Sequence, residues 1–152
     1  MTKKFTFYLA LASIVLSFFC SRSSYAQTLM PIPPHSTTYS GSVRGYWFVA
    51  PTGFTITGLR VALEAGTGTQ SIQVMKIHSG GVALYPTMGT NFTNLFYVNG
   101  ATNGVIQSVS IPVVAGDTIG ILGQAGTTLS YTSSVAPYTT NINGSSVTLN
   151  RF

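Results

Sequence analysis

Charged side chains are scarce in this sequence. Only 6% of the 152 residues are charged, with two acidic and seven basic residues, whereas an ordinary soluble domain has roughly 25%. Two acidic residues are too few for a carboxylate-rich metal cage, and so few basic residues give little counterion release, which argues against a nucleic-acid partner. Disorder is also excluded, because it requires low hydrophobicity and 45% of this chain is hydrophobic.

Cysteine and histidine are equally rare. The only cysteine is Cys20, and the only histidines are His35 and His78. Zinc sites need three or four ligands at a defined spacing, and a nucleophilic triad needs a base beside an orienting acid. The sequence therefore predicts no metal ligand, no cofactor and no catalytic residue. A Ca²⁺ ion held by Asp117 and backbone carbonyl oxygens is the alternative left open.

Glu64 and Asp117 are the only pair of carboxylates that a glycosidase mechanism could use. Asp117 lies in an Ala-Gly-Asp-Thr segment, where an aspartate typically accepts backbone N–H bonds in a tight turn. Glu64 opens a glycine-rich loop, where we expect it to be solvated or paired with Arg60. We therefore expect a protein that is not an enzyme, with a hydrolase as the least favoured alternative.

The first 26 residues have the organisation of a secretory signal peptide. Two lysines precede an apolar run over residues 5–20, and Ser24 and Ala26 are the small residues before the predicted cleavage site. The run is shorter than the roughly 20 residues of a membrane-spanning helix, so an uncleaved anchor is the less favoured alternative. We therefore expect a secreted or cell-surface protein.

Cleavage after residue 26 leaves 126 of the 152 residues and no cysteine, so a hydrophobic core alone must hold the exported domain. Residues 27–36 contain three prolines and are predicted to form a stiff, extended leader. Residues 37–152 are predicted to form one domain. Its charged residues give a net charge of +2 and are Arg44, Arg60, Lys76, Arg151, Glu64 and Asp117.

Thr, Ser, Gly and Asn dominate this domain, and they favour strands and turns over helix interiors. Short apolar or alternating runs predict eight to ten strands, over residues 45–50, 54–63, 71–77, 82–85, 94–98, 105–113, 118–122, 127–132, 139–142 and 145–149. The apolar phase changes at Gly58, which predicts a β-bulge, and Asn143-Gly144 predicts a hairpin. We expect an all-β, antiparallel β-sandwich of jelly-roll-like organisation.

Four segments resemble a β-sandwich domain of secreted bacterial cell-surface proteins. They are residues 45–61 (GYWFVAPTGFTITGLRV), 115–122 (AGDTIGIL), 136–142 (APYTTNI) and 143–149 (NGSSVTL). The resemblance covers nearly all of residues 37–152 and implies the fold, because its motifs are turns and core residues; it implies no catalytic residues. Such domains usually continue with further strands, so we expect either a short member of the group or a piece of a longer chain.

Aromatic residues are the remaining candidates for binding. Sugar-binding sandwiches use exposed Tyr or Trp rings as flat platforms beside amide side chains. Trp47 lies in an apolar strand and is expected in the core. The predicted ligand-binding residues are tyrosines near loops with amide neighbours: Tyr85, Tyr97, Tyr131, Tyr138, Asn94, Asn99 and Gln124. The alternative is that each of these tyrosines packs its ring at the sandwich edge and exposes only its hydroxyl.

Low charge also guides the prediction of function. Weak electrostatic repulsion permits self-association and contact with neutral polymers or neighbouring surface proteins. We expect a secreted, non-catalytic module with a structural or adhesive role at the cell surface. Binding of an extracellular glycan through loop aromatics is the alternative. No contact with nucleic acid, or with a membrane after signal cleavage, is expected.

Overall fold

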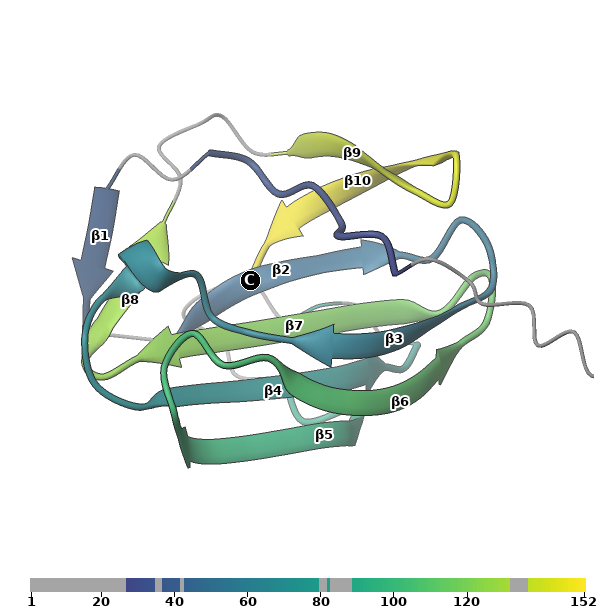
Figure 1. Cartoon of the computed structure of the whole chain (residues 1–152). Coiled ribbons are helices and arrows are strands. Elements are labelled where there is room, and N and C mark those ends of the chain that lie inside the picture. Colours follow the sequence, from purple (N-terminus) through teal and green to yellow (C-terminus); the bar gives the residue numbers. More distant parts are fainter. Residues whose placement is uncertain (1–26, 35–36, 42, 80–81, 83–88, 132–136) are drawn as a thin grey trace, which may run out of the picture.

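Figure 1 shows a computed structural model of the chain, which describes residues 27–34, 37–41, 43–79, 82, 89–131 and 137–152, with the backbone alone for residues 128–131. No helix in this part of the chain is long and apolar enough to cross a membrane. The only helical element described is a single 3₁₀ turn, η1 (Leu63–Ala65). The strands are β1 (Thr37–Ser40), β2 (Arg44–Val49), β3 (Phe54–Leu59), β4 (Gln70–Ile77), β5 (Phe92–Ala101), β6 (Gln107–Val113), β7 (Thr118–Ala125), β8 (Thr128–Tyr131), β9 (Tyr138–Ile142) and β10 (Ser145–Arg151).

β7 is the centre of the larger sheet. It pairs with β2 on one side and β4 on the other; the sheet continues to β10 and β9 beyond β2, and to β5 beyond β4. The end of β7 turns into β8, which pairs with β1. β3 and β6 form a separate two-stranded sheet (Figure 1). Every pair is antiparallel, so the predicted all-β, sandwich-like fold is confirmed, with an uneven division into eight strands and two.

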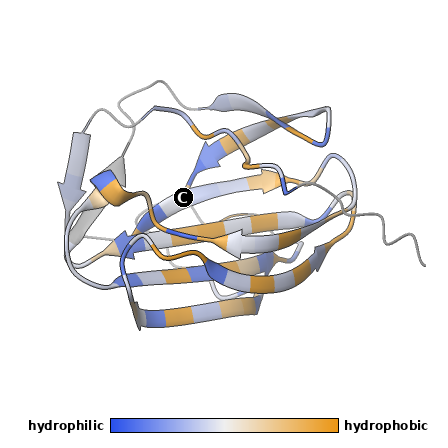
Figure 2. Cartoon of the chain, in the orientation of Figure 1, coloured by the Kyte–Doolittle hydropathy of each residue, from blue (hydrophilic) through white to orange (hydrophobic). Residues whose placement is uncertain are grey.

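The core lies between the two sheets. Phe48, Val74 and Ile119 come from neighbouring strands of the larger sheet, and Ile111 and Val113 come from β6; none of the five is more than 6% exposed. Figure 2 shows hydrophobic and polar residues alternating along β4, β5 and β6. This alternation gives each strand one apolar face, and burial of each large side chain contributes about 1.5–3 kcal/mol.

Two turn features predicted from the sequence are confirmed. The register of β3 with β6 shifts between Ile56 and Gly58, at the change of apolar phase. Asn143 and Gly144 have φ values of 50° and 84° and join β9 to β10. A two-residue type I′ hairpin requires positive φ at both central positions, which these two residue types tolerate.

A close approach of backbones explains Gly45. A Cβ at this position would collide with the carbonyl oxygen of Ile121 on β7. Gly45 also exchanges two backbone hydrogen bonds with Phe152, of 3.0 and 3.4 Å. These bonds bring the Phe152 ring over Gly120, whose missing Cβ would lie 3.1 Å from Phe152 Cε1. Gly45 thus lets β2 approach the backbone of β7 closely, and Gly120 makes room for an aromatic ring.

The predicted strands differ from the structure at several places. The strand predicted over residues 54–63 is too long, because β3 ends at Leu59 and η1 begins at Leu63. β1 is a strand that the sequence does not indicate, since all four of its residues are polar or exposed. The strand predicted over residues 82–85 lies outside the described residues except for Val82, which is not in a strand. β5 and β7 are both longer than predicted.

Gln70 accounts for the path of the chain after β3. Its side chain is fully buried at the start of β4. Its Oε1 accepts the Val61 N–H at 2.9 Å, and its Nε2 donates to the carbonyl oxygens of Thr102 (2.9 Å) and Val105 (2.6 Å). One side-chain amide therefore pairs with backbone groups of two connections that have no strand partner there: the connection between β3 and β4 and that between β5 and β6.

Candidate functional site

The larger sheet has an outer face, turned away from the core, whose residues follow from the strand register. Residues directly opposite each other in a sheet project to the same side. Trp47 on β2 pairs with Gly120, and Gly120 pairs with Met75 on β4. Phe48, one residue later, pairs with Ile119 in the core. The outer face therefore carries the odd-numbered residues of β2 and β4 and the even-numbered residues of β7.

Four of the predicted ligand-binding residues lie together on this outer face. Tyr97 on β5 pairs with Gln73, and Gln124 on β7 pairs with Ser71. Ser71 Oγ donates to Asn99 Oδ1 at 2.6 Å. Gln73 Nε2 donates to Asn94 Oδ1 at 3.1 Å. We call these residues the amide face: Tyr97, Asn94, Asn99, Gln124, Gln73 and Ser71.

A β-bulge brings the β5 members of the amide face to one side. Asn94 and Tyr97 are three residues apart, a spacing that places them on opposite sides of a regular strand. The register of β4 with β5 shifts between Val74 and Met75, so Leu95 and Phe96 both pack against the core. Tyr97 is left 59% exposed on the outer face.

No charged side chain lies on the outer face of the six strands β5, β4, β7, β2, β10 and β9. Their three charged residues, Arg44, Lys76 and Arg151, pair with Gly123, Ile119 and Tyr46, which are register positions of the inner face. Beyond the amide face, β9 and β10 add hydroxyl and amide residues in the outer register, Thr139, Asn141, Ser146, Thr148 and Asn150. The outer face is thus uncharged and polar towards its two edges, while Trp47, Met75 and Leu122 make its centre apolar, with Met75 only 3% exposed.

The other three predicted ligand-binding residues do not join the amide face. Tyr138 pairs with Leu149, which is fully buried, and its half-buried ring packs against the core. Tyr131 lies on β8 opposite Thr37, and its side chain lies outside the described residues. Tyr85 lies entirely outside them. Tyr138 fits the alternative in which a tyrosine packs its ring at the edge of the sandwich.

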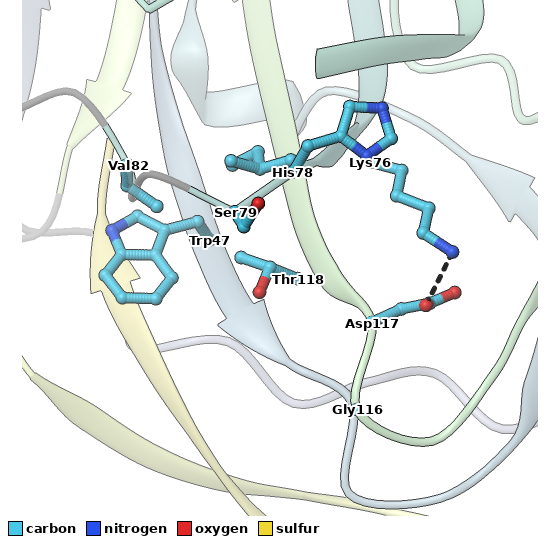
Figure 3. Close-up of a pocket in the computed structure, with 9 residues that line it drawn as sticks. Trp47, Lys76, His78, Ser79, Val82, Gly116, Asp117 and Thr118 are labelled. Carbon is cyan, nitrogen blue, oxygen red and sulfur yellow. Dashed lines mark ion pairs between the residues drawn. The ribbon is translucent and has the colours of Figure 1, made fainter. Parts of the chain in front are cut away.

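A hollow of about 410 Å³ opens at one end of the larger sheet (Figure 3). Its walls come from three places in the chain: Trp47 on β2, residues 76–79 at the end of β4 together with Val82, and residues 116–118 at the start of β7. Figure 3 shows the Trp47 ring at one side and the side chains of Lys76 and Asp117 at the other, with Thr118 between them. The expectation that Trp47 lies in the core is wrong, because its side chain is only partly buried.

The turn before β7 fixes Asp117. Its Oδ2 accepts the Val114 N–H at 3.1 Å, and its own N–H donates to the Val114 carbonyl at 3.0 Å. Its backbone oxygen accepts the Ala50 N–H at 2.8 Å, and the Gly116 N–H donates to the Ala50 carbonyl at 2.8 Å. The predicted role of this aspartate in a tight turn is confirmed.

An ion pair lies in the wall of the hollow. Lys76 Nζ is 2.7 Å from Asp117 Oδ1, and the two side chains are 39% and 15% exposed. The hydrogen bond from Lys76, followed by that from the Val114 N–H, lowers the pKa of the Asp117 carboxyl. The carboxylate therefore stays ionised well into the acid range. On the same side, His78 Nε2 lies 2.8 Å from Thr93 Oγ1.

Sequence reasoning misses the members of the hollow because they are far apart in the chain. Lys76 and Asp117 are 41 positions apart, and only the pairing of β4 with β7 brings the ends of these strands together. Trp47 lies on the outer face because it precedes the core residue Phe48 by one position in β2. The one available signal is that Lys76 is the only charged residue in an otherwise uncharged predicted strand.

No group of three or more potential metal ligands occurs among the described residues. Comparison of the chain with protein-family models, with curated proteins and with solved structures finds no match in any of the three.

Proposed function

We propose that this chain is a secreted, non-catalytic β-sandwich module with an adhesive role at the cell surface, and that its outer face binds a neutral carbohydrate polymer. The observation that carries the proposal is an exposed Tyr97 ring set among amide and hydroxyl side chains on a surface without charge. Secretion rests on the signal peptide predicted over residues 1–26, which lie outside the described part of the chain.

The chemistry of the amide face matches that of a sugar. A sugar hydroxyl can both donate and accept a hydrogen bond. The side-chain amides of Gln73, Asn94 and Gln124 can also do both, because each has an NH₂ donor and a carbonyl oxygen acceptor. The apolar face of a tyrosine ring packs on the C–H face of a pyranose, while its hydroxyl remains in water. A charged polymer has no ion-pair partner on this face, and desolvation of its charges would be uncompensated.

The extent of the face favours a chain over a single sugar. The strands β2 and β5 are separated by β7 and β4, which places Trp47 and Tyr97 about 14 Å apart across the sheet at the usual strand spacing. A ligand that contacts both aromatic residues must therefore consist of several linked units. The resemblance to domains of secreted bacterial cell-surface proteins agrees with such a polymer-binding role and remains part of the proposal.

The test is co-sedimentation of the full chain with insoluble neutral polysaccharides such as cellulose, chitin and xylan. We expect retention on at least one, and Tyr97→Ala should weaken it about tenfold or more, the effect of removing an aromatic ring at the centre of an interface. Tyr39→Ala is the matched control, because Tyr39 is 48% exposed but lies on β1, outside the six strands of the face. The proposal is contradicted if circular dichroism shows a folded chain and no neutral polysaccharide retains it. It is also contradicted if Tyr97→Ala and Tyr39→Ala lose retention equally.

A further inference from the structure

The hollow beside Trp47 differs in chemistry from the amide face. The amide face is flat and uncharged, whereas the hollow combines an aromatic ring, the hydroxyl of Thr118 and the ion pair of Lys76 with Asp117 (Figure 3). Trp47 is not part of the amide face, but it occupies a register position of the same outer face and also lines the hollow. The hollow therefore lies where a chain running across the outer face would reach the end of the sheet.

We propose that this hollow binds a single pyranose unit, with the Trp47 ring against its C–H face and the Lys76–Asp117 ion pair on its hydroxyls. The inference rests on the proposed function, because it assigns the polymer to the outer face and one sugar unit of the same chemistry to the hollow. Its volume of about 410 Å³ is near the lower limit of small-ligand sites, which begin at about 300 Å³.

The ion pair has hydrogen-bonding capacity left for such a ligand. A carboxylate has about four lone-pair positions; Asp117 uses Oδ1 for Lys76 and Oδ2 for the Val114 N–H. An ammonium group has three donors, and the contact with Asp117 uses one. The pair thus offers an acceptor and a donor side by side, 2.7 Å apart, and two adjacent hydroxyls of a sugar can meet both. Hydrogen bonds to charged groups are stronger than those between neutral groups.

Charge on the hollow also favours a neutral ligand. Lys76 and Asp117 neutralise each other at 2.7 Å, so the walls present no net charge from this pair. His78 Nε2 is engaged by the Thr93 hydroxyl at 2.8 Å, on the neighbouring strand β5. An anionic ligand would have to compete with Asp117 for Lys76. A polyhydroxylated neutral ring can bind the pair without separating it.

The aromatic wall supplies a direct measurement. Trp47 is the only tryptophan in the chain, so intrinsic tryptophan fluorescence reports on the hollow. The full chain is titrated with glucose, mannose, galactose, xylose and N-acetylglucosamine, and with linear oligomers of each. We expect a saturable change in Trp47 fluorescence with monosaccharides. Because a polymer on the outer face would also contact Trp47, a change with oligomers alone supports the hollow only where Asp117→Asn and Lys76→Met weaken it, and otherwise overturns the inference.

Variants in the ion pair test the assigned contacts. Asp117→Asn and Lys76→Met should each raise the dissociation constant from the fluorescence titration about tenfold or more. This is the loss of affinity expected when a charged hydrogen-bonding partner is removed. Arg60→Met is the matched control, because it removes an exposed cation that does not line the hollow. Circular dichroism verifies that each variant is folded. Tyr97→Ala should reduce polymer retention but leave the titration with monosaccharides unchanged.

The two proposals fail separately. If a polysaccharide retains the chain through Tyr97 but none of its sugars changes Trp47 fluorescence, the inference about the hollow is overturned and the outer-face proposal stands. Titration curves that are identical in Asp117→Asn, Lys76→Met and the unaltered chain also overturn it. If sugars change Trp47 fluorescence while no polymer is retained, the hollow stands as a sugar site and the polymer-binding role is withdrawn.

Discussion

The two faces of the larger sheet are built from the same strands but differ in how deeply most of their side chains are buried. On the inner face, Phe48, Val74 and Ile119 are at most 1% exposed and pack against the second sheet. On the outer face, Val49, which follows Phe48, is 50% exposed, and Gln73, which precedes Val74, is only partly buried. Because side chains alternate along a strand, one sheet places core residues on one side and the exposed residues of the amide face on the other.

Glutamine makes the comparison sharper, since β4 carries one on each face. Gln70 is completely buried and makes three hydrogen bonds to backbone groups. Gln73 makes one hydrogen bond, to the exposed side chain of Asn94. A buried amide must be fully satisfied or it destabilises the fold, whereas an amide at the surface can exchange its partner for water or for a ligand. The same residue type is therefore structural on one face and available for binding on the other.

The largest effect is expected for Phe48→Ala. Removing a ring that is 1% exposed at the centre of the core should lower the free energy of unfolding by about 3–5 kcal/mol. Val49→Ala, at the next position of the same strand but 50% exposed, should change it by less than about 1 kcal/mol. Urea unfolding followed by circular dichroism measures both. Similar losses in the two variants would show that the outer face of β2 is also packed.

Gln70→Leu should have the next largest effect. It leaves the Val61 N–H and the carbonyl oxygens of Thr102 and Val105 without their partner, and each buried polar group left unpaired costs about 1–3 kcal/mol. We expect a loss of about 2–4 kcal/mol in the same unfolding assay.

Gln73→Leu is the matched control for this prediction, with the same substitution on the outer face of β4. Its effect on unfolding should stay below about 1 kcal/mol, while polysaccharide retention should fall because Gln73 belongs to the amide face. A stable Gln70→Leu variant would mean that the β3–β4 and β5–β6 connections do not depend on this amide.

Local sequence signals predict the features that depend on a few neighbouring residues. The hairpin at Asn143-Gly144, the bulge at Gly58 and the turn role of Asp117 are of this kind, since each follows from the backbone preference or hydrogen bonding of one short segment. The structure agrees with all three. The all-β class follows in the same way from frequent turn residues and short alternating runs.

Strand neighbours decide the rest, and no local pattern encodes them. The outward position of Trp47 depends on its pairing with Gly120, and the inward position of Tyr138 on its pairing with Leu149. Tyr97 is predicted near a loop at the end of a strand over residues 94–98, but β5 extends to Ala101, and the register shift between β4 and β5 places Asn94 and Tyr97 on the same side. Sequence reasoning therefore names four residues of the amide face but does not predict the geometry that groups them.

The smallest effect on stability is expected for the ion pair of Lys76 with Asp117, at the end of the larger sheet. The pKa of Asp117 is lowered in the folded state, relative to about 3.9 for an unfolded aspartate. The ion pair therefore stabilises the fold above about pH 4, and this contribution is lost as the pH falls through the lowered pKa. Because Lys76 is 39% exposed, the contribution should be below about 1 kcal/mol.

Urea unfolding at about pH 7 and about pH 2.5 measures this contribution as a difference between two conditions. Asp117→Asn should flatten the difference, since asparagine does not titrate, and Lys76→Met should reduce it because the first cause of the lowered pKa is removed. If the difference in stability between the two pH values persists unchanged in both variants, it does not arise from this ion pair. Because the outer face carries no charge, polysaccharide retention by the amide face should stay constant across this pH range. Acid should therefore lower the sugar affinity of the hollow before it lowers this retention.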